Sequence, residues 1–335
     1  MKYPFVSILF VALQAGVFWA WSARAESPLL GMPVDCVVGE TCWVVNRVDI
    51  DPGPGAVDHN CGDHTYDTHK GIDIAVAGGN AMQRGVDVLA AVPGVVLGIR
   101  DGMADVDVSV AGRASVAGRE CGNGLLTESE DGWRVQYCHL RRGSVRRGKG
   151  DRVATGEVLG QVGMSGLAQF PHLHLQVSRG GTFFDPDTGL EMGLHPCTAT
   201  GMPMWQPDVA ASLVDGGAAI YLWGIAGDVP DAAEARAGRL DDPSFHPDSP
   251  ALLVWFDMFR PDEGDRLRIR MYMPDGSSFH EQDIVVDKDQ SRRFVYTGKR
   301  RARGAWPAGI YRAEIELTRA ADGKIQQVDI EARIP

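Results

Sequence analysis

The chain has 335 residues, a length that allows two domains of about 100 to 200 residues each. Its 44 acidic residues outnumber 33 lysines and arginines, giving a formal net charge of −11. This balance argues against a nucleic-acid partner, because contact with phosphates requires a basic surface.

Residues 1–25 have the pattern of an export signal. Lys2 precedes the apolar run FVSILFVALQAGVFWAW, and Ala23 and Ala25 mark a small-x-small cleavage site. The run is slightly shorter than the roughly 20 residues of a spanning helix, which favours cleavage over a membrane anchor. No later segment is long and apolar enough to cross a bilayer. We therefore expect no transmembrane span after signal cleavage and a location in the periplasm or cell envelope.

Export changes how the cysteines are interpreted, because an oxidising compartment favours disulfides over zinc thiolates. The segment ECGNGLLTESEDGWRVQYC predicts two strands around the turn SEDG, which would bring Cys121 opposite Cys138. The other pairs are assigned only as the remainder. They are Cys36 with Cys42 and Cys61 with Cys197.

The segment TYDTHKGIDIAV holds the first candidate ligands. His69 and Asp73 are four residues apart, Gly71 between them permits close backbone approach, and IDIAV begins an extended segment. Taken alone, this pair is equally consistent with a surface turn.

Residues 85 to 163 alternate short apolar strands with turn residues, which predicts a mainly antiparallel β domain. In QYCHL, the period of two turns His139 away from Cys138. The basic loop LRRGSVRRGKGDR follows, in which Arg141 and Arg142 are candidate contacts for substrate carboxylates. A solvated turn is the favoured interpretation of this loop.

The segment SGLAQFPHLHLQVSRGG carries two histidines on one predicted strand. His172 and His174 should share one face, while Leu173 and Leu175 share the other. An imidazole from this strand, with His69 and Asp73, would supply three protein ligands. Three ligands leave one position open, as a catalytic zinc site requires.

Proline, glycine and threonine in HPCTATGMPMWQPD predict a linker between residues 26–200 and 205–335. Beyond it, RLRIRMYM, GIYRAEIELT and VDIEARI alternate with period two, which predicts a β-sandwich of immunoglobulin-like type. The expected inward residues include Leu267, Ile269, Met271, Met273, Tyr311, Ala313, Ile315 and Leu317. No catalytic cluster stands out there, so we expect an accessory domain that positions the enzyme or binds a protein partner.

The ordered motifs HKGID, YCHL and PHLHLQV resemble those of the lysostaphin-like, or LytM-type, zinc metalloendopeptidases that act on peptidoglycan. The resemblance covers roughly residues 60 to 185. It implies an antiparallel β metallopeptidase fold, related in shape to lipoyl-like barrel-sandwich folds. It also implies that His69, Asp73 and His174 bind Zn²⁺ and that His139 and His172 are catalytic.

The expected activity is hydrolysis of peptide bonds in peptidoglycan stem peptides or crosslinks. The alternative is a non-catalytic LytM-type regulator that binds and activates another cell-wall hydrolase; retention of all five site residues favours the enzyme. One departure from the family pattern is Phe170, where a small residue is more common. Its side chain would narrow the groove and alter peptide preference.

Overall fold

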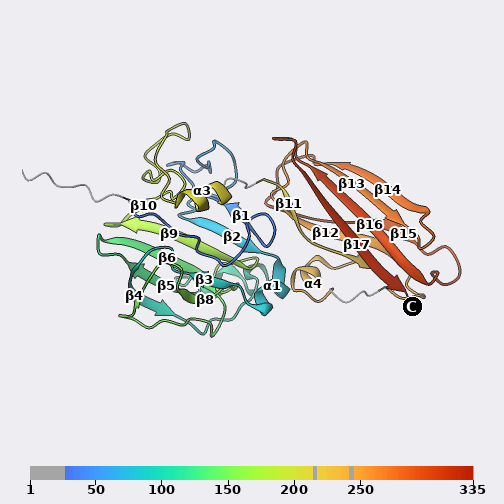
Figure 1. The fold of residues 1–335 in the computed structure, drawn as a ribbon, viewed down its shortest axis with the longest axis horizontal. Coiled ribbons are helices and arrows are strands. Elements are labelled where there is room, and N and C mark those ends of the chain that lie inside the picture. The colour runs from blue at the N-terminus through green and yellow to red at the C-terminus, as the bar shows by residue number, and fades with distance from the viewer. Residues whose placement is uncertain (1–26, 214–216, 241–244, 335) are drawn as a thin grey trace, which may run out of the picture.

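The computed structural model describes residues 27–213, 217–240 and 245–334. The signal and cleavage site expected at residues 1–25 lie outside this part of the chain. The fold is mainly β, with antiparallel strands in two regions and short helices between them (Figure 1). The predicted fold class is therefore confirmed. Within the described residues, no helix has the length and apolar character to cross a membrane.

The N-terminal region is built on one large antiparallel sheet in the order β1-β2-β9-β6-β5-β4-β7, with β10 beside β9, and on the small sheet of β3 and β8. The strands are β1 Cys42–Asn46, β2 Ile72–Val76, β3 Asp87–Leu89, β4 Gly94–Arg100, β5 Asn123–Glu128, β6 Trp133–Leu140, β7 Arg152–Val153, β8 Val158–Gln161, β9 His172–Arg179 and β10 Thr182–Phe184. The helices are α1 Gly78–Arg84, α2 Val108–Ala111 and the 3-10 turn η1 Arg113–Val116.

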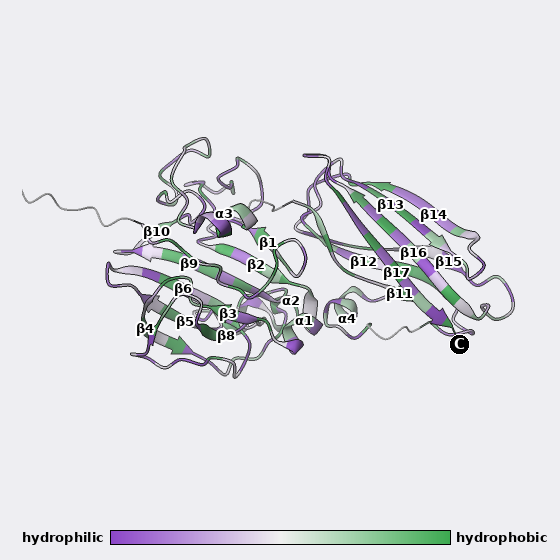
Figure 2. Cartoon of the chain, viewed as in Figure 1, coloured by the Kyte–Doolittle hydropathy of each residue, from purple (hydrophilic) through white to green (hydrophobic). Residues whose placement is uncertain are grey.

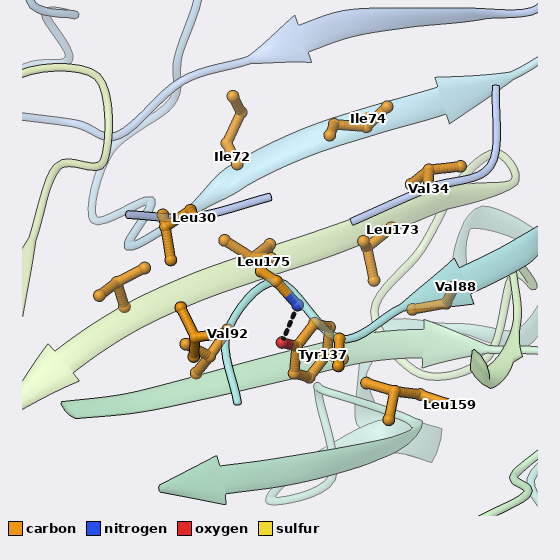
Figure 3. Packing of buried hydrophobic residues seen from close by; sticks show 14 of the residues in the cluster. Leu30, Val34, Ile72, Ile74, Val88, Val92, Tyr137, Leu159, Leu173 and Leu175 are labelled. Carbon is orange, nitrogen blue, oxygen red and sulfur yellow. Dashed lines mark hydrogen bonds between the residues drawn. The ribbon is translucent and has the colours of Figure 1, made fainter. Parts of the chain in front are cut away.

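One face of the large sheet packs into a hydrophobic core (Figure 3). Ile72 and Ile74 of β2 and Leu173 and Leu175 of β9 are fully buried there. The hydroxyl of the buried Tyr137 accepts a hydrogen bond from a backbone amide at 2.8 Å, so its polar end is satisfied. The alternation of β2 and β9 leaves their histidines and aspartate on the opposite face.

The C-terminal region is a sandwich of two antiparallel sheets, ordered β11-β12-β15 and β14-β13-β16-β17. Hydrophobic and hydrophilic residues alternate along its strands (Figure 2). All the inward residues expected from the sequence belong to its core except Met273, which is partly buried against it. The strands are β11 Ala219–Ala226, β12 Ala251–Phe259, β13 Arg266–Tyr272, β14 Ser278–Val285, β15 Arg292–Arg300, β16 Gly309–Thr318 and β17 Ile325–Ile334.

The segment expected to be a linker is packed against the N-terminal core. Met204 and Trp205 are buried there, and Leu30 donates a backbone hydrogen bond to Met204 at 2.6 Å. Helix α3, Pro207–Leu213, adds the buried Leu213 to the same core. These contacts favour a boundary after Leu213, and the boundaries at 200 and 205 stay predictions.

The two regions meet in an aromatic cluster. Trp43 and Val45 of β1 pack with Tyr221 of β11 and Phe259 of β12, and the rings of Tyr221 and Phe259 stack at 3.7 Å between centroids. Beside this cluster, α1 lies against the segment around α4, Ala232–Arg236 (Figure 1). A methyl group on Gly79 would lie 2.6 Å from a backbone oxygen there, so α1 needs glycine at this close approach. The sandwich thus packs directly beside β1 and β2.

The six cysteines form three disulfides, which are the pairs named from the sequence: Cys36–Cys42, Cys61–Cys197 and Cys121–Cys138. They close loops of different size, since their sequence separations are 6, 136 and 17 residues. A cross-link restricts the unfolded chain more strongly when its loop is longer.

Replacing both Cys61 and Cys197 by serine should therefore cost more stability than replacing Cys36 and Cys42. The loss of chain entropy corresponds to about 5 kcal/mol for the long loop and about 2 kcal/mol for the short one. Urea unfolding of the two double variants measures the difference, with coincident transitions by fluorescence and circular dichroism as the control that each variant unfolds in one step. Equal losses would contradict the loop-length argument.

Candidate active site

The candidate site lies on the face of β2 and β9 opposite the hydrophobic core. In the register of these strands, Asp73 pairs with His174 and Ala75 pairs with His172. Directly opposed residues of an antiparallel pair project to the same face. The pairing therefore places both histidines of β9 beside the aspartate of β2.

Three electron-pair donors converge at this point. Nε2 of His69 lies 3.2 Å from Oδ1 of Asp73 and 3.0 Å from Nδ1 of His174, and that Nδ1 lies 2.9 Å from Oδ1. Two imidazole nitrogens and one carboxylate oxygen form a donor set that suits a divalent metal ion. The structure brings the three predicted ligand residues together; their binding of zinc stays a prediction.

The other polar atoms of two of these residues are already occupied. Nδ1 of His69 lies 2.6 Å from the carbonyl oxygen of Arg47, which can only accept, so Nδ1 carries the proton and Nε2 presents its lone pair. Oδ2 of Asp73 accepts a 2.7 Å hydrogen bond from Nδ2 of Asn46. Each side chain thus turns one free donor atom toward the cluster.

The turn before β2 is shaped to deliver His69. The carboxylate of Asp49 accepts from the amide of Thr68 at 2.8 Å, and the Asp49 amide donates to the carbonyl of His69 at 2.8 Å. A methyl group on Gly71 would lie 2.3 Å from a β9 carbonyl oxygen and 2.8 Å from the ring of His174. Only glycine lets the turn approach β9 this closely.

His139 and His172 lie beside the three donors, with ring centroids 4.6 Å apart. Nδ1 of His139 lies 2.7 Å from the carbonyl oxygen of Ser165, and Nδ1 of His172 lies 2.8 Å from that of Phe170. Both Nδ1 atoms therefore donate, and both Nε2 atoms present lone pairs when the rings are neutral. Nε2 of His172 is 3.7 Å from Oδ1 of Asp73.

The backbone of His139 has a φ of 64°, which is rare for a residue other than glycine. Its amide donates to the carbonyl of Cys121 at 2.8 Å, and the adjoining Cys138 is bonded to Cys121. This covalent and hydrogen-bonded surrounding holds the strained conformation, as is common at functional sites.

Burial and nearby charges determine which side chains of the site are ionised. Burial, with the nearby His172 and His174, holds the pKa of His139 well below its usual value, and burial also lowers the pKa of His172. Burial alone would raise the pKa of Asp73, but attraction to His69 and His172 and two hydrogen bonds outweigh it and keep that pKa well below its usual value. The carboxylate is therefore ionised beside two neutral imidazoles.

The two candidate arginines of the basic loop form hydrogen bonds within the protein. Nη1 of Arg141 donates to the carbonyls of Met82 and Gln83 at 3.1 Å, so this side chain holds the end of α1. Arg142 is exposed, and its backbone amide donates to Asp105 at 2.9 Å. These contacts favour a structural role for Arg141 and leave the substrate role of Arg142 a prediction.

Sequence reasoning missed two residues, Asn46 and Arg260. Asn46 holds Asp73, and Arg260 of the sandwich in turn holds Asn46. Asn46 is the last residue of an apolar strand and matches no motif, so the sequence carries no signal for it. The side chain of Phe170 stands between site and sandwich, 4.7 Å from the ring of His172 and 5.5 Å from that of Phe259.

Two more groups in the described part of the chain bring together residues of metal-binding type: His59, Asp185 and Asp187, and Asp63, His64 and Asp262. In the first, Arg47 already pairs with Asp187 at 2.5 Å and supplies the positive charge. In the second, His64 lies 3.4 Å from Asp262 and joins the two regions of the protein.

Comparison with known protein families matches the same stretch of the chain that carries the site. Residues 67–186 match the sequence model of peptidase family M23, which includes all five residues discussed above. The three motifs therefore fall inside one recognised peptidase domain, and the sandwich lies outside it.

Solved structures with similarity to the chain include a variant of the catalytic domain of the prophage-encoded M23 protein EnpA from Enterococcus faecalis. It is 24% identical, covers 48% of this chain and 95% of that chain, and has a TM-score of 0.31. The catalytic domain of the antimicrobial peptidase lysostaphin from Staphylococcus simulans is 24% identical, with coverage of 40% and 84% and a TM-score of 0.27. A chain of the SpoIIQ-SpoIIIAH pore forming complex is 21% identical, with coverage of 50% and 93% and a TM-score of 0.34.

All three TM-scores lie below 0.5, so the family assignment rests on the sequence match. Over residues 67–186, this protein carries a domain of peptidase family M23.

Proposed function

We propose that the protein is an exported zinc metalloendopeptidase that hydrolyses peptide bonds in peptidoglycan stem peptides or crosslinks. The observation that carries this proposal is the convergence of Nε2 of His69, Oδ1 of Asp73 and Nδ1 of His174 beside two further imidazoles. A non-catalytic member of the family would not require His139 and His172 to remain poised next to the donors.

His69, Asp73 and His174 would hold the metal, and their donor atoms fit zinc. When bound, zinc supplies Lewis-acid chemistry, polarising the scissile carbonyl and making water more acidic. The amide of Asn46 holds Asp73, and the carbonyl of Arg47 holds His69, so both side chains are oriented before the metal arrives.

His139 and His172 are suited to move protons. Because each donates from Nδ1 to a backbone carbonyl, the neutral ring can accept a proton only at Nε2. The lowered pKa values keep both rings neutral, so that Nε2 carries no proton. A ring that has taken a proton from the attacking water can then donate it from Nε2 to the leaving amine or to the carbonyl oxygen.

A cavity of about 440 Å³ lies between the N-terminal region and the sandwich, and its lining includes none of the five site residues. Phe170 and Pro171, directly before His172, form part of its wall, and Tyr221 and Arg292 of the sandwich form another part. The guanidinium of Arg292 lies 5.5 Å from the ring centre of Phe170. The sandwich therefore contributes to the wall of a cavity that begins at the two residues directly before His172.

Export to the periplasm or cell envelope is part of the proposal. The signal pattern of residues 1–25 and the three disulfides support it, because disulfides persist in oxidising compartments. A substrate outside the cytoplasm, such as a peptidoglycan peptide, agrees with that location.

The direct test is digestion of purified sacculi by the zinc-loaded protein, with products separated by mass. We expect new amino termini within stem peptides or crosslinks, and the masses identify the bond. Intact peptides, together with stimulation of a second wall hydrolase by the added protein, would overturn the enzyme and support the regulator.

Replacing His69, Asp73 or His174 by alanine should remove both metal and activity. Each change deletes a donor atom from the cluster, so zinc affinity should fall by more than the roughly 10- to 100-fold typical of losing an outer hydrogen-bond partner. Metal analysis after dialysis measures it. Full zinc occupancy in all three variants would show that the ligands lie elsewhere.

Replacing His139 or His172 by alanine should separate hydrolysis from metal binding. We expect kcat to fall by about 10²- to 10⁴-fold, because a proton acceptor is lost, while zinc stays near one ion per chain. Peptide hydrolysis and metal content are measured on the same preparations. A histidine whose loss removes zinc as completely as the loss of His69 has been given the wrong role.

A further inference from the structure

A polar connection crosses the contact between the sandwich and the sheet and ends on Asp73. It begins at Arg260, which follows the last residue of β12 and is only 6% exposed. Nε donates to the carbonyl of Val45 at 2.6 Å, Nη1 donates to the carbonyl of Asp63 at 3.0 Å, and Nη2 donates to Oδ1 of Asn46. The guanidinium thus binds three acceptors, all of them in the N-terminal region.

Asn46 is the middle of this connection. Its Oδ1 accepts from Arg260, and its Nδ2 donates to Oδ2 of Asp73 at 2.7 Å. A side-chain amide can do both at once, and the two bonds fix which end of the amide carries oxygen. Asn46 is 9% exposed, so water competes little for either bond.

The register of β1 delivers Asn46 to this position. Val44 pairs with Ile74, but the next pair joins Asn46, rather than Val45, to Asp73. The ladder therefore contains a one-residue bulge between Val44 and Asn46. Bulges redirect side chains beside active sites, and this one sets an amide against a candidate ligand.

The backbone of Arg260 is also preset. Its φ is 47°, a conformation uncommon outside glycine, and its amide donates to the carbonyl of Ser291 at 3.1 Å. Phe259, directly before it, is held in the aromatic cluster with Tyr221 and Trp43. Packing on one side and strand contacts on the other aim the guanidinium at β1.

At the end of the connection, the two oxygens of Asp73 have separate surroundings. Oδ1 faces His69, His172 and His174, whereas Oδ2 accepts a hydrogen bond from Asn46. Holding Oδ2 prevents rotation of the carboxylate and keeps Oδ1 directed at the imidazoles. The hydrogen bond therefore controls which oxygen is offered to a metal.

We propose that Arg260, acting through Asn46, is a positioning residue for Asp73, so that the C-terminal sandwich completes the metal site of the peptidase domain. This inference rests on the proposed function in taking Asp73 as a ligand. It gives the sandwich a defined task within the active site, in addition to any binding of substrate or protein partner.

The test uses the full-length protein and compares Asn46→Ala, Arg260→Ala, Arg260→Lys and the Asn46→Ala/Arg260→Ala double variant. Zinc affinity is measured by competition with a chromogenic chelator. The single alanine variants should bind zinc about 10- to 100-fold more weakly, as expected for losing a partner that orients a ligand. The double variant should be no weaker than the weaker single variant, because both changes interrupt one connection.

Two further measurements separate positioning from stability. Cobalt-loaded variants should show an altered visible spectrum, since the arrangement of donors around the ion changes. Arg260→Lys, which keeps the charge but has no planar fork, should fold as the parent does and still show weaker binding. The matched control is Leu222→Ala, which trims an apolar side chain where β11 contacts α1 and leaves Phe259, Arg260 and Asn46 in place; its zinc affinity and cobalt spectrum should stay unchanged.

Parental affinity and spectrum in folded Arg260→Lys and Arg260→Ala would overturn the inference. An equal loss of affinity in Leu222→Ala would also overturn it, because general loosening of the contact would then explain the effect. A parent protein that binds zinc tightly but cleaves no peptide would refute the proposed function, while the affinity series would still decide the role of Arg260. A parent protein that binds no divalent metal would refute both.

Discussion

The antiparallel register of β2 with β9 is the constraint on which the site depends. It sets Asp73 opposite His174 and Ala75 opposite His172, while Ile72, Ile74 and the β9 leucines fill the core. A slip of one residue would exchange the two faces, turning the polar site residues into the hydrophobic core and the aliphatic side chains toward the polar cluster. Hydrophobic burial therefore selects the same register that assembles the cluster. The core and the candidate site therefore lie on opposite faces of the same pair of strands.

Because apolar residues and site residues alternate along these strands, much of the site can be predicted from the sequence. The face shared by His172 and His174, the strand position of His139 and the hairpin joining Cys121 to Cys138 all follow from period two and a turn. Such patterns are local. The inward residues of the sandwich are predictable for the same reason.

What the sequence does not predict depends on contacts between distant segments. Asn46 meets Asp73 across 27 residues, and Arg260 meets Asn46 across 214. Neither contact produces a periodic pattern or a motif in the sequence. The bulge that positions Asn46 also interrupts the regular pairing of β1 with β2. The proline- and glycine-rich segment around Trp205 has the composition of a linker, yet its buried side chains pack against the N-terminal core. Composition describes backbone preference there and does not reveal tertiary burial.

The hydrogen bonds of Arg260 also fix the orientation in which the two regions dock. A guanidinium buried without partners is costly, and all three acceptors that satisfy Arg260 belong to the N-terminal region. The aromatic cluster beside it is less selective, because apolar surfaces tolerate sliding and repacking. A shifted docking that kept the rings buried would leave the charge without its acceptors, so the polar contact specifies the arrangement that the apolar contact stabilises. The same bonds reach Asp73 through Asn46, so the docking that satisfies Arg260 also fixes the orientation of the Asp73 carboxylate.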